Sequence, residues 1–143
     1  ITGFISDSKG NIANKVAIEI SLNAINAIML EQNPNDGFGS SGESYLVGAD
    51  KLMRSSSRFQ ENAIMQTMVS SFGVINALND IIGTAVINDY RDVKVLSSYS
   101  KINIPGLDWV ILAEIDYAEA IKSVYFIRNN ILLLTIICII FLF

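Results

Sequence analysis

Six side chains in the middle of the sequence carry groups from which a small-molecule site could be built. Arg54 and Arg58 enclose three serines, so two guanidinium groups and three hydroxyls fall within five residues. The wider set adds a carboxylate and phenols on neighbouring predicted strands or at their ends, a mixture that suits a small zwitterion, such as an amino acid, or a carboxylic acid. The candidate ligand-binding residues are Tyr45, Arg54, Arg58, Asp89, Tyr90 and Tyr99.

The same residues admit a structural interpretation. Either Arg54 or Arg58 can pair with Asp89 in a structural ion pair, while the tyrosines pack with their hydroxyls at the surface. Trp109 is interpreted as a core residue rather than as part of an aromatic cage. The sequence leaves the ligand site and the structural bridge open as alternatives.

Acid–base catalysis is the weaker explanation of the aspartate pairs. Asp89 with Asp92, and Asp108 with Asp116, could in principle act as general acid and base. Their positions are those of turn residues and a helix cap, which explains them without catalysis. The segment is therefore predicted to be non-enzymatic and to use no cofactor.

Composition excludes several function classes. The 143 residues are 51% hydrophobic, enough for one domain with a buried core. Ten basic against fourteen acidic residues give a net charge of −4, which disfavours nucleic-acid binding. The chain has no histidine and a single cysteine, Cys138, in an apolar run, so a zinc site, a disulfide framework and a histidine-activated nucleophile are excluded.

Alternating and turn-forming residues predict the strands that position the candidate site. A strand over 43–47 leads through turn residues 48–51 to apolar Leu52 and Met53, which reads as a β-hairpin. Residues 84–88 and 93–99 form a second hairpin, and the most apolar strand, 109–113, is expected in the centre of the sheet.

Two helices and one further hairpin are predicted from spacing. Residues 3–20 read as a hairpin, and Ser21 can cap a helix whose apolar stripe should pack in the core. Residues 60–80 show apolar residues at helical spacing, with Gly73 as an interruption. The stripe of the first helix consists of Leu22, Ile25, Ile28 and Met29.

The C-terminal part changes character at Asp116. This residue stands where an N-cap belongs, and Glu119 matches the acidic partner of a capping box, so a helix should start at Tyr117 and run ~40 Å to the end. Residues 131–143, ILLLTIICIIFLF, are almost wholly apolar. They fall short of the about 20 residues that cross a bilayer, so they are interpreted as a truncated transmembrane span, with a buried core helix as the alternative. We therefore expect a segment of a longer membrane protein.

Three stretches carry a family resemblance. GESYLVGADKLMRSSSRF, AVINDYRDVKVLSSYSKI and GLDWVILAEIDYAEA resemble the membrane-proximal module of a double Cache sensor, an extracytoplasmic PAS-like domain of bacterial transmembrane receptors. The resemblance implies an α+β fold with an antiparallel five-stranded sheet, flanking helices and a C-terminal transmembrane helix. It implies four parts: closing strands of a distal module in 1–20, a linker helix in 21–32, the proximal module in 33–116, and a signalling helix entering the span in 117–143.

The resemblance also implies a function. Such segments pass a conformational signal to a cytoplasmic output domain in chemoreceptors, histidine kinases and nucleotide cyclases, and lie outside the inner membrane, here residues 1 to about 128. We also expect a homodimer, because the helices that start at Ser21 and at Tyr117 offer surfaces for pairing. The small ligand of such segments, an amino acid or carboxylate, usually binds in the distal module, most of which would be absent here. A membrane-anchored structural or interaction ectodomain without a small ligand is the alternative.

Overall fold

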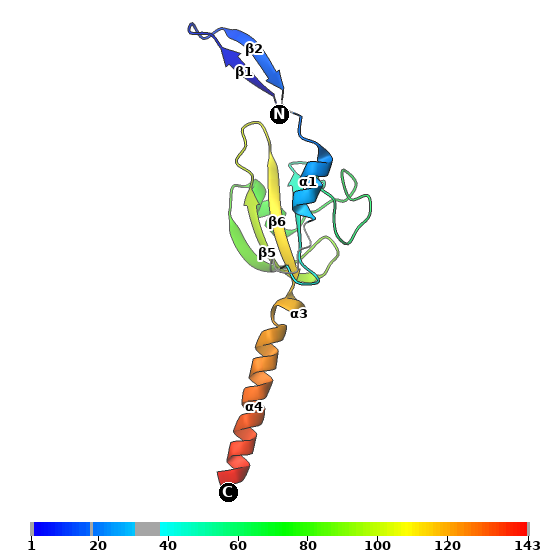
Figure 1. Ribbon diagram of the computed structural model, residues 1–143, viewed down its shortest axis with the longest axis vertical. Helices are drawn as coiled ribbons and strands as arrows, with labels where there is room; N and C mark the ends of the chain where they lie inside the picture. Colours follow the sequence, from blue (N-terminus) through cyan, green and yellow to red (C-terminus); the bar gives the residue numbers. More distant parts are fainter. Residues whose placement is uncertain (1, 18, 31–37, 143) are drawn as a thin grey trace.

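The computed structural model describes residues 2–17, 19–30 and 38–142, which form a small sheet domain between an N-terminal hairpin and a long C-terminal helix (Figure 1). The strands are β1 Thr2–Ser6, β2 Ile12–Ala17, β3 Glu43–Gly48, β4 Gly83–Asn88, β5 Lys94–Lys101 and β6 Trp109–Asp116. The helices are α1 Leu22–Met29, α2 Phe72–Leu78, α3 Tyr117–Ala120 and α4 Lys122–Leu142.

The predicted N-terminal hairpin is confirmed. β1 and β2 pair antiparallel and form a two-stranded sheet of their own. The carboxylate of Asp7 closes the turn by accepting hydrogen bonds from the backbone N–H groups of Lys9 and Asn11. Gly10 adopts a φ of 82°, a left-handed conformation that glycine takes at little cost.

The Ser21 cap is confirmed, whereas the predicted burial of the α1 stripe is only partly so. The Ser21 side chain accepts a hydrogen bond from the N–H of Ala24. Ile25 and Met29 are half-buried, but Leu22 and Ile28 remain 45% and 68% exposed. Residues 31–32, where the predicted linker helix ends, lie outside the described residues.

The central sheet has four strands rather than the predicted five. Its order is β3-β6-β5-β4 with every neighbour antiparallel, so β6 lies in the interior as its apolar sequence predicts. The expected fifth strand around Leu52 and Met53 forms only isolated bridges, to Met68 and Val47. The tight turn before it is present, with Lys51 at φ 66°, since Gly48 donates to the carbonyl of Leu52 and Arg54 donates to the carbonyl of Leu46.

The predicted helix over 60–80 is largely wrong. Only Phe72–Leu78 is helical, and the preceding segment turns at Asn62 and Met65, which have φ values of 54° and 58°. The helical spacing there misleads because Met65 and Met68 are 54% and 64% exposed instead of sharing a buried face. Gly73, predicted as an interruption, lies inside α2, where an added Cβ would stand 3.0 Å from the ring of Tyr99.

The core lies between one face of the sheet and a layer made of α2 and the segment from residue 49 to residue 71. Alternate residues of β3, β5 and β6 point into it, as the strand period of two requires. Its fully buried apolar residues include Tyr45, Val47, Met53, Val69, Val74, Val95, Val110 and Leu112.

The C-terminal helix begins at Tyr117 as predicted but is divided at Ile121 into α3 and α4. Arg128 and the two asparagines after it interrupt the apolar sequence of α4. The apolar residues that follow, from Ile131 to Ile140, are exposed around the helix. Within residues 2–17, 19–30 and 38–142 no helix is both long and apolar enough to cross a membrane.

Replacing Leu112 with alanine should lower the free energy of unfolding by about 2–5 kcal/mol, because the side chain is fully buried in the core. Leu96→Ala is the matched control, since Leu96 lies on the opposite face of the same sheet and is 37% exposed. It should cost about 1 kcal/mol or less. Urea unfolding followed by circular dichroism measures both, and equal losses would contradict the assigned core face.

Candidate functional site

Two buried glutamates face each other across the sheet. Glu43 of β3 and Glu114 of β6 are direct partners in the antiparallel register, and each is only 3% exposed. Opposed residues of this kind have Cβ atoms about 5 Å apart, and like charges placed so are destabilising. With Asp89 and Asp116 they form what we term the carboxylate cluster.

Hydroxyl groups provide most of the hydrogen bonds to the two glutamates. Tyr45 Oη donates to Glu114 Oε2 at 2.8 Å, and Tyr90 Oη donates to Glu43 Oε1 at 2.6 Å. Ser57 Oγ donates to Glu43 Oε2 at 3.0 Å. Burial, with the nearby glutamates, raises the pKa of both phenols, so the tyrosines remain protonated donors.

Glu114 of β6 and Ser97 of β5 are opposed residues in the register, and both side chains are buried on the core face of the sheet. Burial raises the pKa of Glu114, while the neighbouring hydroxyls of Ser97 and Tyr45 oppose that shift. The Glu114 carboxylate and the Ser97 hydroxyl therefore act on each other across the β5–β6 pair, on the core face of the sheet.

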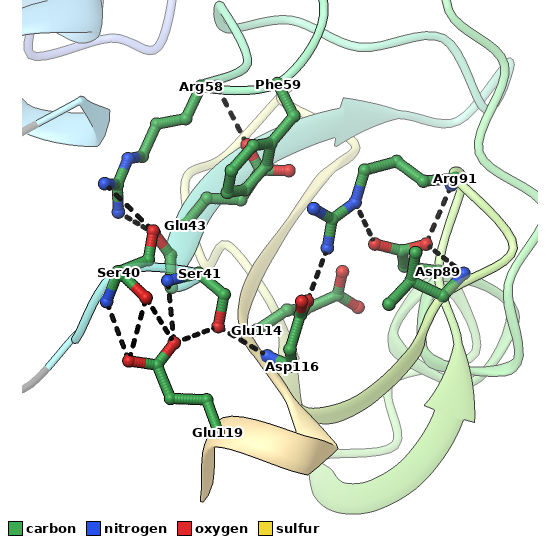
Figure 2. Close-up of polar contacts among 12 residues, drawn as sticks. Ser40, Ser41, Glu43, Arg58, Phe59, Asp89, Arg91, Glu114, Asp116 and Glu119 are labelled. Carbon is green, nitrogen blue, oxygen red and sulfur yellow. Dashed lines mark hydrogen bonds and ion pairs between the residues drawn. The ribbon is translucent and has the colours of Figure 1, made fainter.

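Arg91 connects the β4–β5 turn to the start of α3 (Figure 2). Its Nε donates to Asp89 Oδ2 at 2.6 Å and its Nη2 to Asp116 Oδ1 at 2.9 Å. The guanidinium carbon lies 4.2 Å from the centre of the Phe59 ring, a cation–π arrangement. Both ion pairs are shielded from much of the solvent, since the side chains of Asp89, Arg91 and Asp116 are 1%, 21% and 31% exposed.

Glu119 of α3 binds the loop that precedes β3. Its carboxylate accepts from the backbone N–H groups of Ser40 and Ser41 at 2.9 and 2.8 Å and from both serine hydroxyls (Figure 2). These donors lower the pKa of Glu119 to about 2. Arg58 fastens the other side of the loop by donating to the carbonyl oxygens of Gly42 and Ser40.

The predicted capping box at Asp116 is wrong. The Asp116 side chain makes no capping hydrogen bond, because it pairs with Arg91, and Glu119 turns outward to the serine loop. The hydroxyl of Ser41 instead accepts from the backbone N–H of Asp116 at 3.1 Å. A distant loop thus takes over the role expected of a local cap.

The structure brings four of the six predicted site residues together. Tyr45, Asp89 and Tyr90 lie in or beside the carboxylate cluster, and the backbone N–H of Arg58 donates to Glu43 at 2.9 Å. Their role as ligand-binding residues stays a prediction.

Arg54 and Tyr99 lie elsewhere. Arg54 pairs with Asp50 at 2.6 Å, and Tyr99 packs edge-to-face with Phe72.

The predicted ion pair of Asp89 with Arg54 or Arg58 is wrong in its arginine. Asp89 pairs with Arg91, not with Arg54 or Arg58. Tyr45 is fully buried, so its hydroxyl does not lie at the surface.

Sequence reasoning missed Glu43, Glu114 and Arg91. The two glutamates carried a readable signal: each stands two residues from a core position, Tyr45 in β3 and Leu112 in β6, so strand alternation turns each to the core face. Arg91 gave no such signal, because its partner Asp116 is 25 residues away.

No family model matches the chain, and neither does any curated protein at a significant level. Among solved structures, the extracellular domain of mmHK1S-Z2, a candidate histidine kinase, matches 82% of the chain at a TM-score of 0.56 and 17% identity. The chain shares its fold with part of that domain. It spans 45% of that domain's length.

A weaker likeness is to the ligand-binding domain of the amino acid chemoreceptor PctB of Pseudomonas aeruginosa PAO1. Two structures of that domain, one in complex with L-Arg and one with L-Gln, match at a TM-score of 0.47 and 21% identity over 78% of the chain. The chain spans 41% and 44% of their lengths.

Glu119→Gln should remove a pH-dependent part of the stability. Because the folded-state pKa is depressed from 4.5 to about 2, the wild-type contact contributes fully above about pH 4.5 and is lost as the pH falls toward 2. The wild type should therefore exceed the variant in unfolding free energy near neutral pH, and the difference should shrink on acidification. Glu61→Gln, at an exposed position, is the control. A difference that is constant with pH would contradict the assigned contact.

Proposed function

We propose that this chain is an extracytoplasmic sensing segment of a transmembrane receptor, which passes a ligand- or partner-induced change from its sheet through α3 and α4 toward the membrane and a cytoplasmic output domain. The likeness in fold to the extracellular domain of a candidate histidine kinase supports this proposal. The output is a chemoreceptor, kinase or nucleotide cyclase module, and this segment itself is not catalytic.

One observation carries the proposal: the carboxylate cluster is joined directly to the helix that leaves the domain. Arg91 bridges Asp89 in the β4–β5 turn and Asp116 at the start of α3. Independently, Glu119 of α3 holds the loop before β3. A shift at the buried end of the sheet must therefore either move α3 or break these contacts, which is the behaviour of a two-state relay.

We further propose the division of the chain that the family resemblance implies. The separate β1–β2 sheet would be the closing strands of a distal Cache module in 1–20, α1 the linker helix in 21–32, the central sheet the membrane-proximal module in 33–116, and the remainder the signalling helix. The pairing of β1 and β2 with each other alone among the described strands supports a boundary after them.

We also propose that two copies of the segment associate. α1 leaves Leu22 and Ile28 largely exposed, and apolar residues of α4 such as Ile131 and Leu134 are 60% and 66% exposed. Apolar helix surfaces of this kind are suited to pairing with the same helices of a second copy.

The coupling predicts a selective effect of Arg91→Ala. Loss of its two ion pairs should increase amide hydrogen exchange in α3 by about tenfold, which is the effect expected from losing one or two charge-assisted hydrogen bonds. Exchange of the amides in the centre of β6 should not change. Arg54→Ala is the matched control, because it removes an ion pair to Asp50 that does not contact α3. Unchanged exchange in α3 of the Arg91 variant would show that the cluster and the helix are not coupled.

The sensing function itself is tested with a panel of amino acids, carboxylic acids and amines added to the 143-residue chain. At least one compound should raise the melting temperature and change amide exchange in α3 together. If every compound in the panel, and every candidate partner domain, leaves α3 exchange unchanged, the relay proposal is wrong.

A further inference from the structure

Two lysines line a groove at the place where the sheet meets the C-terminal helices. The groove has a volume of about 560 Å³ and is formed by the start of β5, by α3 and by the beginning of α4. Lys94 lines it from β5 and Lys122 from α4. Within the described part of the chain neither lysine has an ion-pair partner. The groove therefore contains two ammonium groups that the protein itself does not neutralise.

The acidic residues of this region are bound to other groups. Asp116 is the acid among the lining residues, and it pairs with Arg91 at 2.9 Å. Asp92 and Glu119 are not among the lining residues. Asp92 accepts from Asn88 Nδ2 at 2.9 Å, and Glu119 accepts from the loop that precedes β3. The lining of the groove therefore has a net positive charge, although the chain as a whole has a net charge of −4.

The rest of the lining is apolar or aromatic. Lys94 Nζ lies 5.1 Å from the centre of the Tyr117 ring, a cation–π contact that leaves the ammonium N–H groups available to an acceptor. The apolar and aromatic lining residues are Val93, Tyr117, Ala118, Ile121 and Tyr125. A ligand that joins an anionic group to an apolar body matches this combination of side chains.

Exposed apolar residues of α4 follow directly after the groove. Val124 and Phe126 are 62% and 69% exposed, and Val124 lies only ~3 Å along the helix axis from Lys122. Figure 1 shows α4 extending away from the sheet beyond α3. Arg128 comes next, with its guanidinium carbon 4.6 Å from the centre of the Tyr125 ring. Basic and aromatic residues beside an exposed apolar stretch are typical of a segment at a membrane–water interface.

We propose that this groove binds the headgroup of an anionic phospholipid, whose phosphate contacts Lys94 and Lys122 and whose acyl chains lie along the apolar residues of α4. Lysine ammonium groups bind phosphate oxygens, and basic pockets at a membrane surface bind anionic headgroups. The inference names a lipid partner of the proposed receptor segment and so rests on the proposed function. Because Lys94 belongs to β5 and Lys122 to α4, one bound headgroup would link the sheet to the helix.

A membrane lipid fits the groove better than a free phosphate ion. A free ion would use the two ammonium groups alone and leave Ile121, Tyr125 and the exposed apolar residues of α4 in water. A phospholipid would cover these residues as well, and burial of apolar surface is favourable. Because the apolar residues of α4 are exposed around the helix, pairing with a second copy would leave others of them for lipid.

The first experiment compares vesicles of different charge. The wild-type chain of 143 residues is mixed with vesicles of phosphatidylcholine alone and with vesicles of an equimolar mixture of phosphatidylcholine and phosphatidylglycerol. Because the apolar residues of α4 can enter either bilayer, the measured quantity is the ratio of the two affinities in vesicle sedimentation. The ratio should favour the anionic vesicles by roughly tenfold or more and should fall as the salt concentration rises.

Variants locate the binding. Lys94→Gln and Lys122→Gln should each lower the affinity ratio by roughly fivefold, and the double variant should lower it further. Lys9→Gln is the matched control, because it removes the same charge at an exposed position in the turn between β1 and β2 and should leave the ratio unchanged. Since neither groove lysine has an ion-pair partner in the described structure, both variants should fold, which circular dichroism checks.

A short-chain lipid separates a headgroup site from a merely charged surface. Dihexanoyl phosphatidylglycerol, kept below the concentration at which it forms micelles, should raise the melting temperature and slow amide exchange in α3 and at the start of α4. Inorganic phosphate at the same concentration should do neither. The Lys94→Gln/Lys122→Gln double variant should lose both effects of the lipid.

Equal affinity for the two kinds of vesicle, an unchanged ratio in the groove variants or an equal loss in Lys9→Gln would overturn the lipid site. The same holds if inorganic phosphate acts as strongly as the short-chain lipid. If the lipid site is overturned while a compound of the soluble panel still changes amide exchange in α3, the sensor function stands. If the lipid binds as expected while no compound or partner domain changes that exchange, the site is confirmed and the relay is rejected.

Discussion

The opposition of Glu43 and Glu114 is the constraint on which the polar half of the domain depends. Two acids on the core face of neighbouring strands repel each other and lose their hydration, so the fold has to supply donors from elsewhere. It does so from Tyr45 on β3 itself, from Tyr90 in the β4–β5 turn and from Ser57 in the segment after β3. The positions of that turn and that segment are therefore tied to the charge state of the pair.

The same arrangement explains why one end of the sheet is polar and the other apolar. At the end of β6 that joins α3, the core face carries the acidic residues Glu114 and Asp116. At the other end of the same strand, it carries the apolar residues Val110 and Leu112. The apolar end provides the packing that stabilises the domain, and the polar end meets the helix that leaves it.

The sequence predicted the elements whose signals are local. Ser21 capped α1, the turn residues at 89–92 separated β4 from β5, and the apolar run from Trp109 placed β6 inside the sheet. The resemblance to an extracytoplasmic sensor agrees with the fold likeness found by structure comparison. The elements that the sequence does not predict depend on contacts between distant residues. Asp116 stands where a helix cap belongs, but its side chain pairs with Arg91 from another turn, and the apolar residues over 60–71 do not share one buried face.

The break at Ile121 gives the C-terminal helix the properties of a lever. α3 is four residues long and fixed to the domain through Asp116 and Glu119, whereas α4 extends for 21 residues away from it (Figure 1). At ~1.5 Å per residue α4 is ~31 Å long, so a rotation of ~10° about Ile121 would carry its far end ~5 Å sideways. Backbone hydrogen bonds from Ile121 to Tyr117 and from Tyr125 to Ile121 continue across the break. If α3 and α4 move together, a displacement of about 1 Å at the serine loop, applied across the one turn of α3, would be enlarged several-fold along α4.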